Sequence, residues 1–293
     1  MNKIQGTGVA LVTPFDTKGE VDYSALKKLV NYQVEGGTDF LVVHGTTGEA
    51  ATLNESEKQK IVELIFEESQ KRVPIVLGLS GNNTKAIVEK YKTVDASQVD
   101  AFLCASPHYN KPSQKGIVEH FTSIADVAKK PIVLYNVPGR TGSNMSSDTT
   151  LKLSEHENII AVKEASGDME QVMEIIADSS DDFSVLSGED ALTLPMIACG
   201  AKGVISVVAN AFPKHFGQMV SAAMKGDFKT ARELHYLLLN VTQLFFTEGN
   251  PSGVKVSLAH QKIIENELRL PLTSVSQSLR EKINEETDRV LSR

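Results

Sequence analysis

Short runs of apolar and β-branched residues recur along the first 225 residues of the chain, and helix-like stretches separate them. Several runs are apolar at every position, which is typical of strands buried on both faces. Their spacing is about one strand–helix unit. The predicted strands are Val9–Thr13, Phe40–Val43, Ile75–Leu79, Ala101–Ala105, Ile132–Tyr135, Ile159–Lys163, Phe183–Leu186 and Gly203–Val207.

The segments between these strands carry apolar residues at helical spacing, as in the stripe that contains Leu26, Leu29 and Val30. Asn54 followed by Glu57 predicts a capping box at the start of another helix. The segment 189–198 contains a proline, so its helix is expected to be short or kinked. Eight strand–helix units in about 225 residues favour a closed (β/α)8 TIM barrel. A doubly wound open sheet is the alternative, although it normally has fewer strands.

After the eighth strand the pattern contains helices alone. One helix is predicted to start at Pro213 and end near Gly226, and Asp227 caps the next. The segment 249–253 breaks the pattern, and two further helical stretches follow up to Leu291. The sequence therefore predicts a catalytic barrel domain over residues 1–226 and a C-terminal helical domain over 227–293. We expect this extension to provide scaffolding or a subunit contact rather than chemistry.

Composition narrows the class of protein. The 293 residues are 41% hydrophobic and 23% charged, as in an ordinary globular protein, and the net charge of −7 argues against nucleic acid or anionic membrane as a partner. The chain shows no apolar signal core and no stretch of 18 apolar residues. Cys104 and Cys199 are expected to be buried thiols in a reducing compartment. The scattered histidines predict no metal site. We expect a soluble cytoplasmic enzyme.

One predicted strand, Ile159–Lys163, ends in a lysine where the strand should still be buried. A break at Ser166-Gly167 follows, and Asp168 with Gln171 predicts a capping box that opens the next helix. A surface ion pair between Lys163 and Glu164 is one interpretation. Neighbouring residues on a strand point to opposite faces, which weakens it. Because an unpaired buried lysine is rare, a functional amine is equally plausible on this stretch alone.

Active sites of (β/α)8 enzymes lie at the carboxyl ends of the strands. Here those ends carry polar and small residues. Taken singly, each has a structural explanation: a turn at Gly45–Gly48, satisfied core hydroxyls for the tyrosines, and a solvated loop position for the arginine. What favours a site is their convergence on one lysine. The strand ends are followed by His44–Glu49, Ser106–Asn110, Tyr135–Gly142, Lys163, Ser187–Gly188 and the region of Ser206.

This set of groups suits Schiff-base chemistry. A free lysine is almost entirely protonated at pH 7, and burial favours the neutral amine, which is the nucleophile. A neutral amine beside a tyrosine and an anion-binding loop can form an imine with a keto acid. The iminium acts as an electron sink and yields an enamine that attacks an aldehyde. Tyr135 would shuttle protons and Arg140 would hold a second carboxylate.

Four motifs resemble the dihydrodipicolinate synthase family of pyruvate-dependent class I aldolases: Gly8–Phe15, Gly45–Glu49, Tyr135–Gly142 and Val162–Gly167, which contains Lys163. The resemblance covers essentially the whole chain. It implies condensation of pyruvate with L-aspartate 4-semialdehyde to 4-hydroxy-tetrahydrodipicolinate, in diaminopimelate and lysine biosynthesis, without a cofactor, by a homodimer or homotetramer. It also implies an imine on Lys163, a proton relay of Tyr135, Thr46 and Tyr109 with Tyr109 entering the neighbouring subunit's site, and substrate contacts from Thr47, Arg140, Gly188 and Ile205.

The sequence departs from the family pattern at the regulatory site. Members inhibited by lysine usually carry a tyrosine where this chain has His108, and histidines where it has Glu55 and Lys58. Asn82 is retained. We therefore expect feedback inhibition by lysine to be weak or absent.

Two alternatives to the synthase reaction remain at the level of sequence. Another pyruvate-dependent aldolase or lyase, such as N-acetylneuraminate lyase, shares the lysine and tyrosine motifs. The arginine of the Pro-Gly-Arg-Thr-Gly loop argues against it, because that residue is typical of the synthase. A non-catalytic metabolite-binding protein of the same fold is the second alternative. It would be expected to lack the lysine or the relay, and both are present.

Overall fold

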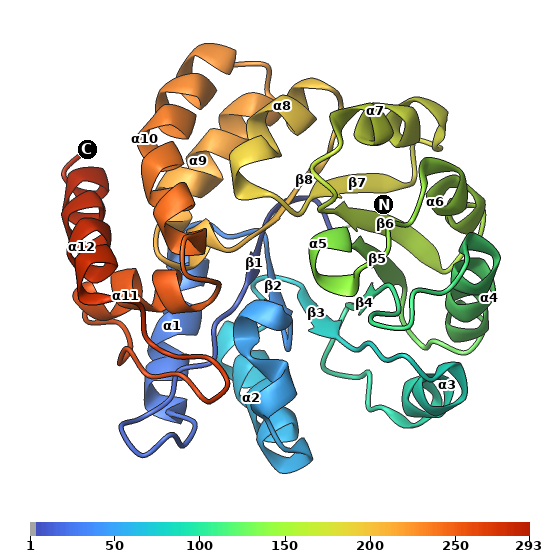
Figure 1. The fold of residues 1–293 in the computed structure, drawn as a ribbon, viewed down its shortest axis with the longest axis horizontal. Helices are drawn as coiled ribbons and strands as arrows, with labels where there is room; N and C mark the ends of the chain where they lie inside the picture. The colour runs from blue at the N-terminus through green and yellow to red at the C-terminus, as the bar shows by residue number, and fades with distance from the viewer. Residues whose placement is uncertain (1–3) are drawn as a thin grey trace.

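The computed structural model describes residues 4–293 and confirms the predicted fold class (Figure 1). In this part of the chain, eight parallel strands close into a barrel in sequence order, and the eighth pairs with the first. The strands are β1 Gly6–Ala10, β2 Phe40–Val43, β3 Ile75–Gly78, β4 Ala101–Ala105, β5 Ile132–Asn136, β6 Ile159–Glu164, β7 Ser184–Ser187 and β8 Gly203–Ser206.

The largest error in the strand predictions concerns β1, which begins three residues before the predicted start at Val9. Its first residues are Gly-Thr-Gly, which lack an apolar signal. A Cβ on Gly8 would meet the Phe40 ring at 2.2 Å, so glycine is required where β1 approaches β2. The chain leaves the barrel after Leu11, because the N–H of Val12 donates to the side chain of Asn210 instead of to a strand. Apolar residues beyond that point are buried outside the sheet.

Helices alternate with the strands and cover the outside of the barrel. The capping box of Asn54 and Glu57 is present as predicted. The helix predicted to be short over 189–198 is split into a 3-10 turn at Asp190–Leu192 and α8. The helices of the barrel are α1 Tyr23–Glu35, α2 Glu55–Ser69, α3 Thr84–Thr93, α4 Gln114–Ala125, α5 Pro138–Thr141, α6 Ser147–Ser154, α7 Met169–Asp178, α8 Thr193–Ala198 and α9 Pro213–Met224.

The barrel has two hydrophobic layers. A large cluster fills the space between strands and helices, and a smaller one, which includes Val133, Ala161 and Ile205, fills the inside of the barrel. Because side chains alternate along a strand, Lys163 follows Ala161 into the barrel. Glu164 follows Val162 toward the helices.

Three further helices follow the barrel: α10 Phe228–Phe246, α11 Ser252–His260 and α12 Gln277–Leu291. Asp227 caps α10 as predicted, and α10 packs on α9 and α12 (Figure 1). The residues of α11 from Ser252 to Leu258 are all buried. The division into domains at residue 226 stays a prediction. Within residues 4–293, every helix is too short or too polar to cross a lipid bilayer.

Candidate active site at the carboxyl end of the barrel

Lys163 lies inside the barrel beside Tyr135. Only 6% of the lysine is exposed, and its Nζ is 4.2 Å from the centroid of the Tyr135 ring. The two residues are register partners on β5 and β6, so the sheet itself sets their separation. The interpretation of Lys163 and Glu164 as a surface ion pair is wrong, since both are buried and their side chains leave opposite faces of β6. The structure thus places a buried amine next to a phenol.

Gly188 allows the end of β7 to approach this lysine. A Cβ at Gly188 would lie 3.2 Å from Cε of Lys163, 3.0 Å from the carbonyl oxygen of Glu164 and 2.6 Å from Cβ of Ala165. The N–H of Gly188 donates to the Glu164 carbonyl at 2.7 Å. Any larger residue would displace either β6 or the lysine side chain. Ile205 also lies inside the barrel and is 1% exposed, so the structure brings both predicted lining residues to this interior.

Glu189, which sequence reasoning missed, follows Gly188 at the same end of the barrel. Burial raises the pKa of its carboxyl, and the neighbouring Asp190 adds to the rise. The positive charges of Lys163 and Arg140 lower that pKa in part, so both groups act on one carboxyl. The position of Glu189 directly after Ser187-Gly188, at the end of β7, is the feature of the sequence that could have identified it as a site residue. Arg140 itself is exposed on α5, the short helix that follows β5.

Glu164 is the centre of a buried polar network on the outer face of β6. The side-chain N–H groups of Asn136 donate to its two carboxylate oxygens at 3.1 and 3.0 Å, and the N–H of Ser166 donates at 2.7 Å. Gln171 adds a fourth bond at 3.2 Å. Burial raises the pKa of Glu164, while these donors oppose the rise. The network ties together the ends of β5 and β6, one residue beyond Tyr135 and Lys163.

This network corrects the predicted capping box at α7. Asp168 does cap the helix, because its Oδ1 accepts the N–H groups of Glu170 and Gln171 at 3.0 and 3.2 Å. The reciprocal half of the box is wrong. The side chain of Gln171 turns to Glu164 and Asn144 instead of to the backbone of Asp168. The N–H of Asp168 donates to the hydroxyl of Ser166 at 3.1 Å, and the side-chain oxygen of Gln171 accepts from Asn144 at 2.7 Å, so both halves of the missing bond have other partners.

The threonine loop, residues 45–49, forms a 3-10 turn after β2. Thr47 is 3% exposed, whereas Thr46 is on the surface. The loop packs closely on the segment after β1, since the hydroxyl of Thr13 donates to the carbonyl of Gly48 at 2.6 Å. Just before the loop, burial lowers the pKa of His44 to about 4, so this ring is neutral at pH 7.

A buried ion pair holds the end of this loop. This pair was not predicted from the sequence. Nζ of Lys255, on α11, donates to Oε1 of Glu49 at 2.5 Å, and both side chains are fully buried. The second oxygen of Glu49 accepts the N–H of Arg269 at 3.1 Å. Burial lowers the pKa of Lys255, while the charge of Glu49 opposes this shift. The two partners are 206 residues apart in sequence, so no local pattern signals the contact.

Tyr109, which the sequence predicts as a relay residue, lies on the surface of the single chain. Its side chain is 88% exposed, while its N–H donates to the carbonyl of Thr141 at 3.0 Å. The backbone φ of Tyr109 is 72°, a left-handed value that turns the loop outward. Asn82 holds the preceding residue, because it donates to the carbonyl of His108 at 3.0 Å. The loop of Tyr109 is therefore fastened to α5, with the phenol free to meet another molecule.

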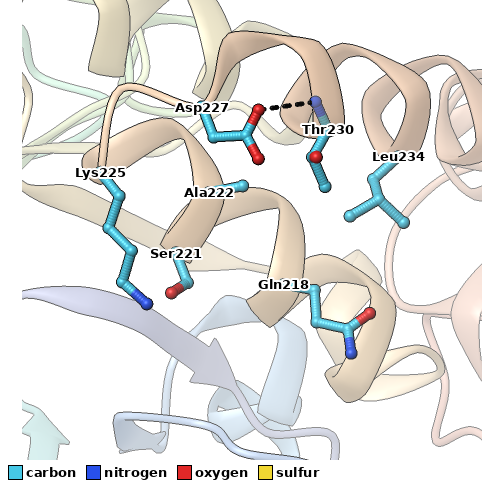
Figure 2. Close-up of a pocket in the computed structure, with 7 residues that line it drawn as sticks. All are labelled: Gln218, Ser221, Ala222, Lys225, Asp227, Thr230 and Leu234. Carbon is cyan, nitrogen blue, oxygen red and sulfur yellow. Dashed lines mark hydrogen bonds between the residues drawn. The ribbon is translucent and has the colours of Figure 1, made fainter.

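A surface groove of about 310 Å³ lies elsewhere, between α9 and α10 (Figure 2). In this groove the side chain of Asp227 accepts the N–H of Thr230, which caps α10. The lining residues include no strand end and no residue of the threonine loop, so the groove is separate from the lysine. The groove is lined by Gln218, Ser221, Ala222, Lys225, Asp227, Thr230 and Leu234. Among residues 4–293, no three histidine, cysteine, aspartate or glutamate side chains gather to hold a metal ion.

A closed (β/α)8 barrel with a lysine buried beside a tyrosine at the end of β6 defines an enzyme of the lysine-dependent aldolase class. The family model of the dihydrodipicolinate synthetase family matches residues 3–289, and the chain belongs to this family. It is 50% identical to 4-hydroxy-tetrahydrodipicolinate synthase of Parabacteroides distasonis, over 96% of this chain and 95% of that protein.

Solved structures agree with this assignment. The crystal structure of dihydrodipicolinate synthase from Aquifex aeolicus superposes with a TM-score of 0.92 at 43% identity and covers 96% of both chains. That of dihydrodipicolinate synthase from Acinetobacter baumannii complexed with pyruvate has a TM-score of 0.95 at 37% identity, over 98% of this chain and 99% of that one. The predicted family resemblance is therefore confirmed.

Proposed function

We propose that the chain condenses pyruvate with L-aspartate 4-semialdehyde to 4-hydroxy-tetrahydrodipicolinate, a reaction of diaminopimelate and lysine biosynthesis. The observation that carries this assignment is Lys163, buried inside the barrel with its Nζ 4.2 Å from the Tyr135 ring. The relative from Parabacteroides distasonis bears the name of this synthase, and the crystal structure of the Acinetobacter baumannii enzyme is of its complex with pyruvate. Both support the choice of reaction.

In this reaction Nζ of Lys163 attacks C2 of pyruvate, and the C2 oxygen leaves as water to give an imine. Loss of a proton from C3 forms an enamine, which makes a carbon–carbon bond to the aldehyde carbon of the semialdehyde. The amino group of the bound semialdehyde then attacks C2 and displaces the lysine, which closes the ring. One water is lost overall and the lysine is regenerated, so no cofactor is consumed.

We assign the following roles to the predicted site residues. Tyr135 contacts the amine and would transfer protons as the water forms, with Thr46 as the next member of the relay. The buried hydroxyl of Thr47 would hold the carboxylate of pyruvate, and Arg140 the carboxylate of the semialdehyde. Gly188 and Ile205 would line the site. A large aliphatic residue at position 188 would collide with the lysine stem.

A homodimer or homotetramer is part of the proposed function. The exposed phenol of Tyr109 supports it, because a relay residue that is 88% exposed in one chain needs a second chain to bring it to a site. The net charge of −7 and the family chemistry leave small molecules as the substrates, with no nucleic acid or membrane partner. The two unpaired thiols support a cytoplasmic location.

Trapping with borohydride tests the assignment directly. Pyruvate and borohydride together are expected to add one reduced pyruvyl group to Lys163, detected as a mass increase on the peptide that contains it. Borohydride without pyruvate is the control. A second measurement supplies L-aspartate 4-semialdehyde or N-acetylmannosamine as the aldehyde, and turnover is expected with the first alone. An adduct on another lysine, or none, contradicts the assignment.

We expect L-lysine to inhibit this enzyme weakly or not at all. Lys58 supplies a cation where lysine-inhibited members tend to carry a histidine, and Glu55 is already paired with Lys58 at 3.1 Å. Like charge disfavours a second ammonium group. The measurement is initial rate against L-lysine concentration at saturating pyruvate. Half-maximal inhibition at sub-millimolar lysine would show the expectation to be wrong.

A further inference from the structure

The C-terminal segment reaches the threonine loop at a second point besides the Lys255–Glu49 pair. The side-chain Nδ2 of Asn250 donates to Oγ1 of Thr47 at 2.9 Å. Asn250 is 8% exposed and Thr47 is 3% exposed, so water does not compete freely for this bond. Asn250 lies just before α11, 203 residues after its partner. The middle of the turn, at Thr47, and the residue that follows it, Glu49, are thus held by one C-terminal segment.

The direction of this bond decides what the Thr47 hydroxyl can do. A hydroxyl has one proton to donate and two lone pairs. Because the Asn250 amide donates to Oγ1, it occupies a lone pair and leaves the proton of Thr47 for another acceptor. Among residues 4–293, the bond from Asn250 is the one hydrogen bond that the Thr47 hydroxyl makes. The hydroxyl is therefore prepared as a donor for an anion.

The Asn250 amide contributes little to stability by other contacts. Its Oδ1 is buried and has no hydrogen-bond partner among residues 4–293. An unpaired buried carbonyl group costs free energy, so an apolar residue would serve the packing of this position as well. The bond to Thr47 is the polar contact that the side chain makes. This distinguishes Asn250 from Ser257 on α11, whose hydroxyl pairs with Thr287 inside the helical segment at 2.8 Å.

We propose that Asn250 is a positioning residue that sets the Thr47 hydroxyl as a donor to the carboxylate of the keto acid, so that the C-terminal segment tunes pyruvate binding. Lys255 and Glu49 hold the loop in place, and Asn250 orients its hydroxyl. The role is to bind the carboxylate in the free substrate and in the imine alike. Loss of such uniform binding raises KM and leaves kcat nearly unchanged.

Asn250→Ala is the test, with the concentration of pyruvate that gives half-maximal borohydride trapping as the readout. We expect that concentration and the KM for pyruvate to rise about tenfold. This corresponds to losing the hydrogen bond from the Thr47 hydroxyl to the charged carboxylate of pyruvate. The KM for the aldehyde and kcat should change by less than about threefold. Asn250→Asp should be worse than Asn250→Ala, because an aspartate accepts the Thr47 proton and repels the carboxylate. Ser257→Ala removes a buried hydrogen bond from the same segment and should leave the pyruvate dependence unchanged.

A double-mutant cycle separates positioning from a general structural effect. In a Thr47→Val background, Asn250→Ala should have no further effect on half-maximal trapping, because the group that it orients is gone. Since this role for Thr47 rests on the proposed function, wild-type protein is trapped first. If the wild type forms no adduct, the proposed function fails. If the wild type forms the adduct and Asn250→Ala shows the same pyruvate dependence as the wild type, the role of Asn250 is overturned. The same holds if Asn250→Ala and Thr47→Val act independently on half-maximal trapping.

Discussion

Replacing Lys163 with alanine is expected to lower kcat by roughly a thousandfold or more and to abolish the pyruvate adduct. The barrel places this amine beside Tyr135, and Gly188 leaves room for its stem. Without that amine, C2 of pyruvate has no covalent electron sink, and Tyr135 has no imine to protonate. The measurements are steady-state kcat and the mass of the borohydride-reduced protein.

Lys202→Ala is a matched control for this substitution. Lys202 precedes β8, and its carbonyl accepts the N–H of Gly6 at 2.9 Å, so it lies at the amino end of the barrel, opposite the site. This variant should keep kcat within about twofold, as surface substitutions away from special features usually have small effects. Far-UV circular dichroism shows whether Lys163→Ala is folded. A folded variant that retained wild-type turnover would exclude Lys163 as the covalent centre.

The barrel could be predicted because its signals are local. Each strand is a short apolar run bounded by polar or small residues, and each helix has a stripe at its own period. The position of Lys163 could also be predicted locally, because side chains alternate along a strand. Val162 faces the helices, so the next residue, Lys163, faces the inside of the barrel. The start of β1 could not be predicted, because the glycines at positions 6 and 8 are required by close approach to Asp39 and Phe40, just before and at the start of β2.

The supporting residues of the site could not be predicted because their partners are distant. The sequence around Glu164 suggested no role for it. The residues that donate hydrogen bonds to its carboxylate, Asn136 and Gln171, come from β5 and α7. Contacts from the C-terminal segment to the threonine loop span more than 200 residues. The extension was expected to act as scaffolding or a subunit contact. It also supplies the buried partner of Glu49, next to a residue that would bind substrate.

Replacing Lys255 with methionine is expected to destabilise the protein by about 3–5 kcal/mol. Methionine fills much of the same volume, so the main cost is the Glu49 carboxylate, which would be left buried without its cation. The carbonyl of Glu267 would also lose its bond to Nζ, which is 2.8 Å long. The free energy of unfolding, from urea titration followed by circular dichroism, is the measurement. Lys282→Met, an exposed lysine on α12, is the control and should change it by less than about 0.5 kcal/mol.

The double variant Glu49→Met and Lys255→Met separates the charge from the packing. Removing both members of a buried ion pair is often nearly neutral, whereas removing one leaves an uncompensated charge. The double variant should therefore be more stable than Lys255→Met alone, by about 2 kcal/mol or more. If the two were equally unstable, the cost would lie in packing around α11 and not in the unpaired carboxylate. If Lys255→Met were as stable as the wild type, the pair would not hold the loop, and the fixed geometry assigned to Thr47 would lose its support.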